Sequence, residues 1–226
     1  PDPTGIVESL AYCERITYHA SYKLVELTGF KNCRSSSTGF TRSAYTKVGG
    51  YDDMLTEDLA FAHKAYRHNL NIQQSRNYTS IMEAPHTLRD FWGQRKRWRM
   101  GQVETLHKSV AGTLTDGLWY RRYISIGRMS ASMIGSIILI VVISKLVILV
   151  LVGTTIFYLT PLIIVSLIAT ICGYRDKKLK DIDSIKYIPV MAPLVYPIFS
   201  FLLVKSLLEY LLTWDGSWYH VEKTEN

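Results

Sequence analysis

Two short sets of residues carry side chains that could do chemistry on a polar substrate. The first set is Thr56, Glu57 and Asp58, which stand where an apolar helical repeat begins. Acids in the first turn of a helix are often structural, since each stabilises the helix by about 0.3–1 kcal/mol through its attraction to the positive end of the helix dipole. The same dipole favours a negative charge there, so such a carboxylate can also accept a proton. The pattern therefore fits both a general base and an ordinary helix start.

The second set is Gln94, Arg97 and Trp98, in the stretch QRKRW. Spacings of three and four residues place all three side chains on one face of a helix, while Lys96 and Arg99 point elsewhere. A guanidinium can form paired hydrogen bonds with phosphate oxygens, and an indole can lie against the apolar face of a sugar ring. The set thus suits a polyhydroxylated, partly anionic ligand. A basic, aromatic helix at a membrane surface is the alternative.

The elements expected around these residues are helices, short strands and a glycine turn. Apolar spacing predicts helices over 6–27, 57–69 and 87–108. Residues 35–45 and 70–75 are typical of a strand edge and a short strand. Gly49 and Gly50 predict a turn just before the first chemical set, and Thr56 is expected to cap the helix that follows.

Apolar residues are concentrated in the second half of the chain. Residues 124–172 carry only two charges, Arg128 and Lys145, and are long enough for two membrane-spanning helices. A third stretch, 188–212, is also long enough, but it contains three prolines, a lysine and a glutamate. It predicts either a spanning or an interfacial helix.

The net charge of +7 has a membrane explanation. The basic residues cluster beside the apolar segments, as expected for positive flanks kept on the cytosolic side, so no nucleic-acid partner is expected. The three cysteines show no CxxC spacing and indicate neither a disulfide framework nor a zinc site. A reducing compartment fits this pattern.

The order of these features resembles the processive family-2 glycosyltransferases, which include cellulose, hyaluronan, chitin and poly-N-acetylglucosamine synthases. Residues 35–101 carry the resemblance, because they contain Thr-Glu-Asp and then QxxRW ahead of the apolar segments. It implies an α/β fold, with part of a GT-A (Rossmann-like) domain followed by transmembrane and interfacial α-helices. The expected divisions are 1–85 for the C-terminal part of the catalytic domain, 86–122 for an amphipathic interfacial region, 123–213 for membrane helices and 214–226 for a possible gating tail.

The resemblance also implies an activity and a location. The activity is inverting, processive transfer of sugar from a nucleotide-diphosphate donor to a growing saccharide. The location is the plasma membrane, where a multi-pass protein crosses the lipid bilayer and keeps its catalytic part on the cytosolic face. Asp58 is then the general base that deprotonates the acceptor hydroxyl, and Glu57 is its supporting neighbour.

The same resemblance assigns the second set to the acceptor end of the site, with Arg97 near the diphosphate and Trp98 against the acceptor sugar. Gln94 completes that lining. A weaker match lies near the C-terminus, where many of these synthases have a gating loop over the donor. The candidate gating residues are Trp218, Lys223 and Thr224. A polar tail with interfacial tryptophans is the alternative, and gating requires 188–212 to be interfacial.

The chain departs from the family pattern before Thr56. Members bind the nucleotide and Mg²⁺ or Mn²⁺ through aspartates, including an Asp-x-Asp pair, and no such pair precedes the Thr-Glu-Asp set here. Asp52 and Asp53 stand in the turn beside the candidate base instead. We therefore expect the metal ligands in an N-terminal half or a second polypeptide, and no activity from this chain alone. The competing hypothesis is a non-catalytic membrane subunit or a degenerate relative.

Overall fold

For the part of the chain that it describes, the computed structural model defines the bounds of five helices. They are α2 (Arg42–Val48), α3 (Glu57–Arg67), α4 (Leu88–Val110), α5 (Trp119–Val150) and α7 (Ile188–Thr213). The structure describes residues 5, 7–8, 10–12, 14–15, 29–31, 33, 38–73, 82–111, 117–150, 163–164, 167, 171 and 188–213. Helices alone are assigned within these ranges, so the α/β character expected for the catalytic part is not visible in them.

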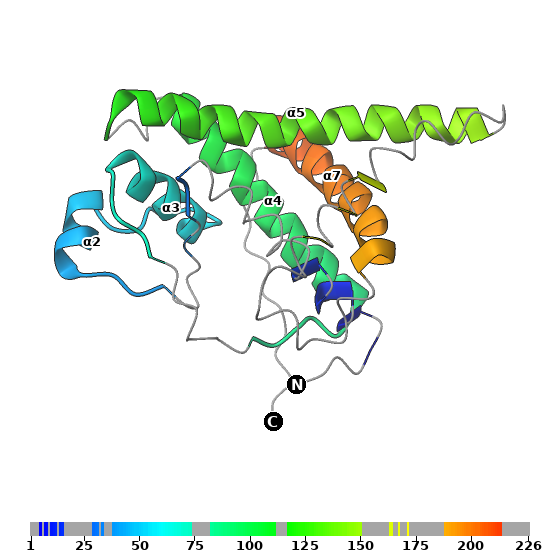
Figure 1. Cartoon of the computed structure of the whole chain (residues 1–226), viewed down its shortest axis with the longest axis horizontal. Coiled ribbons are helices and arrows are strands. Elements are labelled where there is room, and N and C mark those ends of the chain that lie inside the picture. The colour runs from blue at the N-terminus through cyan, green and yellow to red at the C-terminus, as the bar shows by residue number, and fades with distance from the viewer. Residues whose placement is uncertain are drawn as a thin grey trace.

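Helices α4 and α7 lie side by side, and both pack against α5, which runs across one end of the molecule (Figure 1). Helices α2 and α3 lie beyond α4, and α3 contacts both α4 and α5. One buried apolar cluster joins α4, α5 and α7 to the loop before α3. Its members are Leu55, Met100, Val103, Met133, Leu203 and Tyr210. The helix that begins with Glu57 and Asp58 is therefore placed by the same core that holds α4.

Helix α2 corrects the strand edge expected over 35–45. Residues 38–41 are irregular and the helix begins at Arg42, because the Thr41 side chain accepts a hydrogen bond from the Ala44 amide (3.2 Å). The predicted turn is confirmed. Gly49 and Gly50 both adopt positive φ, 78° and 77°, which only glycine takes without strain. Gly49 ends α2 in the left-handed conformation that commonly terminates helices.

Helix α3 confirms the helix predicted over 57–69, with its last regular residue at Arg67. The strand predicted over 70–75 is wrong for its described part, since residues 70–73 are irregular. A strand needs a neighbouring strand to satisfy its backbone groups. Here the Ile72 carbonyl accepts a hydrogen bond from Lys31 Nζ instead (2.6 Å).

The C-terminal half of α3 is attached to the start of α5 at three points. His63 contacts the Ser125 hydroxyl, Arg121 donates to the Tyr66 carbonyl (2.9 Å), and the Leu118 amide donates to the Arg67 carbonyl (2.9 Å). Burial, with smaller contributions from nearby arginines, lowers the pKa of His63 to about 3. The imidazole is therefore neutral at physiological pH, and its contact with Ser125 does not depend on protonation.

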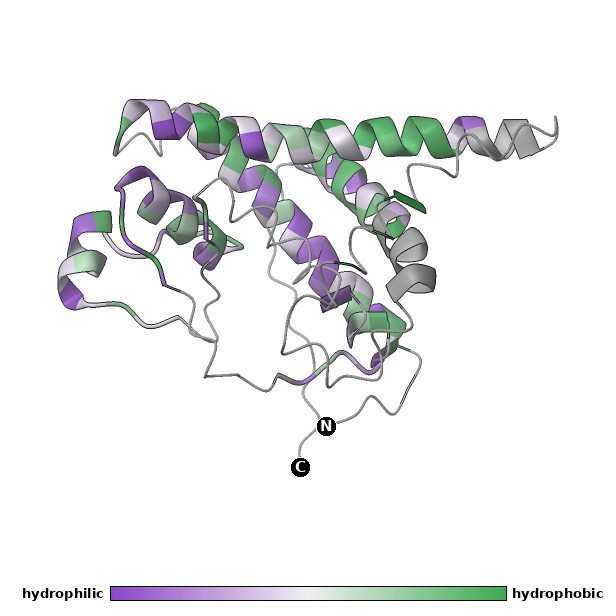
Figure 2. Ribbon diagram, in the orientation of Figure 1, coloured by the Kyte–Doolittle hydropathy of each residue, from purple (hydrophilic) through white to green (hydrophobic). Residues whose placement is uncertain are grey.

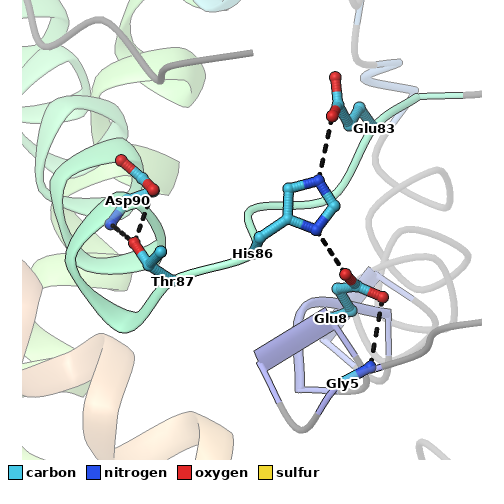
Figure 3. Close-up of polar contacts among 6 residues, drawn as sticks. All are labelled: Gly5, Glu8, Glu83, His86, Thr87 and Asp90. Atoms are coloured by element: carbon cyan, nitrogen blue, oxygen red, sulfur yellow. Dashed lines mark hydrogen bonds and ion pairs between the residues drawn. The ribbon is translucent and has the colours of Figure 1, made fainter. Parts of the chain in front are cut away.

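Helix α4 confirms the helix predicted over 87–108. The Thr87 hydroxyl accepts from the Asp90 amide (3.1 Å) and donates to the Asp90 carboxylate (2.6 Å), which caps the first turn (Figure 3). Just before the cap, His86 lies between two carboxylates, with Nδ1 2.5 Å from Glu8 and Nε2 3.0 Å from Glu83 (Figure 3). These contacts join the N-terminal segment to the start of α4.

Helix α5 contains the first predicted span. Trp119–Lys145 is the one stretch among the described residues that is long and apolar enough to cross a membrane, and hydrophobic residues dominate its second half (Figure 2). The helix begins earlier than expected and continues past Lys145 to Val150. The second predicted span, 146–172, lies mainly outside the described residues.

Helix α7 covers the third predicted stretch. Leu202, Leu203 and Ser206 are buried against the neighbouring helices, whereas Leu211 and Leu212 are exposed. The two charged residues of α7 form ion pairs. The Glu209 carboxylate lies 2.9 Å from the Lys96 ammonium of α4 and 3.7 Å from the Lys205 ammonium. The third stretch is helical as predicted, and its spanning and interfacial alternatives both stay predictions.

Candidate active site

The first turn of α3 presents the two acids. Thr56 occupies the N-cap position, but its side chain makes no capping hydrogen bond, so the expected cap is wrong. Instead, the Asp58 carboxylate accepts from the Leu59 amide (2.7 Å). The Thr56 hydroxyl is buried without a hydrogen-bond partner among the described residues, because the side chain is packed against α4.

The contact between Thr56 and α4 is made at Gly101. A Cβ at Gly101 would lie 2.5 Å from Thr56 Cγ2 and 2.9 Å from Thr56 Cβ, so only glycine allows this approach. One turn further along α4, Glu104 accepts a hydrogen bond from the Leu55 amide (3.1 Å). The Lys108 ammonium donates to the Asp53 carbonyl (3.3 Å). The loop that leads into α3 is thus held by residues on three successive turns of α4.

This contact brings the two sequence sets to the same place. Gly101 follows Gln94, Arg97 and Trp98 by seven, four and three residues, so all four lie on one face of α4. Trp98 precedes Gly101 by a rise of only about 4.5 Å along the helix axis. The turn that carries the candidate base therefore rests on the same helix face, one turn beyond the indole.

The surroundings of Asp58 include a thiol and a phenol. Burial, and then the Asp58 charge, raise the pKa of Cys33 to about 11, so the Cys33 side chain is a neutral thiol. Burial also raises the pKa of Tyr51, with further contributions from Cys33, Glu57 and Asp58. Both groups therefore keep their protons at neutral pH close to the candidate base. The sequence reading did not connect either residue with Asp58.

The surroundings of Trp98 include two guanidinium groups. The Arg95 guanidinium carbon lies 4.5 Å from the centre of the indole ring, and that of Arg15 lies 5.5 Å away. Arg95 also donates to the Gln94 side-chain oxygen and to the Glu14 carboxylate. Glu14 gives no signal in the sequence, because it stands 81 residues before its partner.

The neighbouring residues outside this face behave as expected. Lys96 pairs with Glu209, and the Arg99 guanidinium lies 4.9 Å from the Phe199 ring centre, so both point toward α7. The candidate gating residues Trp218, Lys223 and Thr224 lie outside the described residues.

The carboxylates beside the site do not form a metal centre. Asp52 is paired with the buried Lys64 ammonium (3.0 Å), which neutralises its charge. Among the residues that the structure describes, no group of three histidine, cysteine, aspartate or glutamate side chains could hold a metal ion. The described residues therefore do not fit a bound Mg²⁺ or Mn²⁺.

The start of α3, which carries two acids, is docked on the face of α4 that bears an amide, a guanidinium and an indole. Comparison with known families identifies the class of protein. The chain belongs to the family described as Glycosyl transferase family group 2, whose sequence model matches residues 35–172, more than half of the chain.

The curated relatives narrow the resemblance to polysaccharide synthases. The poly-β-1,6-N-acetyl-D-glucosamine synthase of Staphylococcus aureus strain COL is 36% identical over 78 residues, and that of Staphylococcus epidermidis is 35% identical over 78 residues. Each match takes in 34% of this chain and 19% of the relative. The chain therefore matches about a fifth of the length of these relatives. No solved structure gives a significant match.

Proposed function

We propose that this chain carries the acceptor side of an inverting polysaccharide synthase active site. Sugar is transferred from a nucleotide-diphosphate donor to the end of a growing saccharide. N-acetylglucosamine is the first donor sugar to test, because the named relatives make its polymer. The finer expectations of processivity and a GT-A fold belong to this proposal.

The observation that carries the proposal is the packing of Thr56 on Gly101. It puts the start of α3, with Asp58, on the face of α4 that bears Gln94, Arg97 and Trp98, one turn beyond Trp98. A general base must come within hydrogen-bond reach of the hydroxyl it deprotonates. Residues joined at this one contact can meet the same acceptor, although they are far apart in sequence.

The proposed step is an in-line displacement at the anomeric carbon. Asp58 takes the proton of the acceptor hydroxyl as that oxygen bonds to the donor sugar, and the bond to the departing diphosphate breaks on the opposite side. Arg97 places positive charge near the departing diphosphate, which stabilises charge that develops there. Trp98 lies against the acceptor sugar ring, Gln94 offers an amide to its hydroxyls, and Glu57 supports the base.

The proposal includes parts outside the described residues. Because the described carboxylates do not fit a divalent cation, we place the Mg²⁺ or Mn²⁺ ligands in a preceding segment or a second polypeptide. Trp218, Lys223 and Thr224 remain the candidates for a gating segment. In this proposal α5, which is long and apolar enough to cross a membrane, anchors the site in the bilayer of the cell membrane. A cytosolic catalytic part and further membrane crossings belong to the proposal as well.

Replacing Asp58 with asparagine tests the proposal. In the full-length synthase, in membrane vesicles, we expect Asp58→Asn to lower sugar transfer by roughly 100-fold or more, because general bases contribute rates of that order. Donor binding, measured by displacement of a labelled nucleotide-diphosphate sugar, is expected to persist. Incorporation from a panel of such sugars identifies the donor in the same assay.

Asp53→Asn is the matched control for this substitution. Asp53 stands in the same loop, but its side chain is exposed and only its carbonyl contacts α4. We expect transfer close to the unsubstituted rate. Turnover of Asp58→Asn at the control's rate would refute the assigned role of Asp58.

A further inference from the structure

Arg95 occupies an unusual place within the second chemical set. Its side chain is 1% exposed, and its guanidinium carbon lies 4.3 Å from the Phe91 ring centre and 4.5 Å from the Trp98 ring centre. Phe91 stands one helical turn before Arg95 and Trp98 one turn after it. The planar group is therefore flanked by two aromatic rings, a geometry in which cation–π attraction is strongest when water is excluded.

The same guanidinium is held in its plane by hydrogen bonds. Nε donates to Glu14 Oε2 (2.8 Å), Nη2 donates to the same oxygen, and Nη1 donates to Gln94 Oε1. The forked group of arginine fixes direction in a way that a lysine ammonium does not. One side chain thus orients both the Gln94 amide and the Trp98 ring.

Glu14 supplies the charge that holds Arg95. Its carboxylate is also 1% exposed, and burial raises its pKa while the neighbouring Arg95 charge opposes that rise. Replacing a buried ion pair with apolar residues of similar volume is often neutral or stabilising, so stability alone gives little reason for this pair. Orientation of neighbouring groups gives a better one.

We infer that Arg95 is a positioning residue for sugar transfer, which holds the Gln94 amide and the Trp98 indole in place for the acceptor saccharide and is itself held by Glu14. This inference rests on the proposed function, because the acceptor contact of Trp98 belongs to it. It adds a residue between Gln94 and Arg97, and a carboxylate 81 residues away, to the acceptor side of the site.

Acceptor kinetics in the full-length synthase test the inference, with an oligosaccharide primer as the acceptor. Trp98→Ala gives the reference effect on the primer KM. Arg95→Lys keeps the charge but loses the fork and the flat stacking, so we expect the primer KM to rise roughly tenfold. The donor KM is expected to stay within about twofold, since orientation of the indole acts on the acceptor.

Two further variants separate positioning from a structural role. Glu14→Leu with Arg95→Met replaces the buried pair by apolar side chains, and we expect a folded protein with an unfolding temperature near the original and a raised primer KM. Arg95→Lys in a Gln94→Ala, Trp98→Ala background is expected to add nothing beyond about twofold, because Arg95 acts through these two side chains. Arg99→Lys on the same helix is the control, since Arg99 contacts Phe199 and Gln102.

The possible outcomes distinguish failure of the inference about Arg95 from failure of the proposed function. If Trp98→Ala raises the primer KM but Arg95→Lys and the Leu–Met double variant leave it unchanged, Arg95 is structural only and the inference is overturned. Full additivity of Arg95→Lys with the Gln94→Ala, Trp98→Ala pair would overturn it as well. An unchanged primer KM in Trp98→Ala itself would overturn the proposed acceptor contact, and the inference with it.

Discussion

Replacing Gly101 with alanine is expected to slow sugar transfer much more than it destabilises the protein. The added Cβ would lie 2.5 Å from Thr56 Cγ2, whereas carbon atoms in contact are about 3.5–4.0 Å apart. Thr56 is buried and β-branched, so relief requires the start of α3 to move away from α4 by roughly 1 Å. Asp58, two residues further on, moves with it.

The expected magnitudes follow from two opposing effects. Overpacking costs about 1–3 kcal/mol, while alanine in place of glycine inside a helix returns up to about 1 kcal/mol. The net loss of stability is therefore small. A displacement of about 1 Å at a reacting group can cost around 100-fold in rate, so we expect kcat to fall by roughly 10- to 100-fold.

The assay pairs transfer rate with thermal unfolding in the full-length protein. Gly127→Ala is the matched control, because Gly127 lies inside α5 and a Cβ there meets nothing within 4 Å. Thr56→Ala removes both Oγ1 and Cγ2, the two atoms nearest to the added Cβ, and is expected to restore part of the rate in the Gly101→Ala background. Turnover of Gly101→Ala equal to that of Gly127→Ala would refute the claim that this contact sets the position of Asp58.

Two other contacts give predictions of their own. Hydrogen bonds with Glu83 and Glu8 raise the pKa of His86, so the stability that its charge supplies is complete below the ordinary histidine pKa and is lost as pH rises through the higher folded-state value. Thermal unfolding between pH 5 and pH 9, about the range of such titrations, is expected to show this loss, and His86→Gln to abolish it; an identical pH profile for both proteins would contradict the assignment. Glu104→Ala leaves the Leu55 amide without its acceptor and is expected to lower the unfolding free energy by about 1–3 kcal/mol. Glu104→Gln keeps an acceptor oxygen and is expected to lose less, and equal losses in urea titrations of the two variants would count against that hydrogen bond.

Local signals predicted the helices that position the site. Thr87 caps α4 through Asp90, three residues away, and the apolar spacing that follows is sufficient to identify the helix. Gly49 and Gly50 likewise form the turn that their type indicates. The strand edge predicted over 35–45 wrongly includes the start of α2, because so short a helix shows no clear period and the prediction did not use the cap at Thr41.

Residue types and spacing single out the candidates Asp58 and Trp98 but not the contacts that hold them. Gly101, three places after Trp98, could have indicated a close helix contact, but the sequence analysis did not use it. The unbonded Thr56 hydroxyl and the Glu14 to Arg95 ion pair depend on contacts between distant parts of the chain. No local pattern encodes such partners, so the residues that orient the site came only from the structure.

The attachment of α3 to α5 has a consequence for how lipids act on this enzyme. The apolar stretch of α5 is 27 residues long, and a span longer than the hydrocarbon layer adapts by tilting. Three contacts tie the far end of α3 to the start of α5, so under the proposed function a change in tilt is expected to shift the helix that packs on Gly101. The position of Asp58, and with it the rate of the proposed sugar transfer, is then expected to depend on acyl-chain length and bilayer thickness.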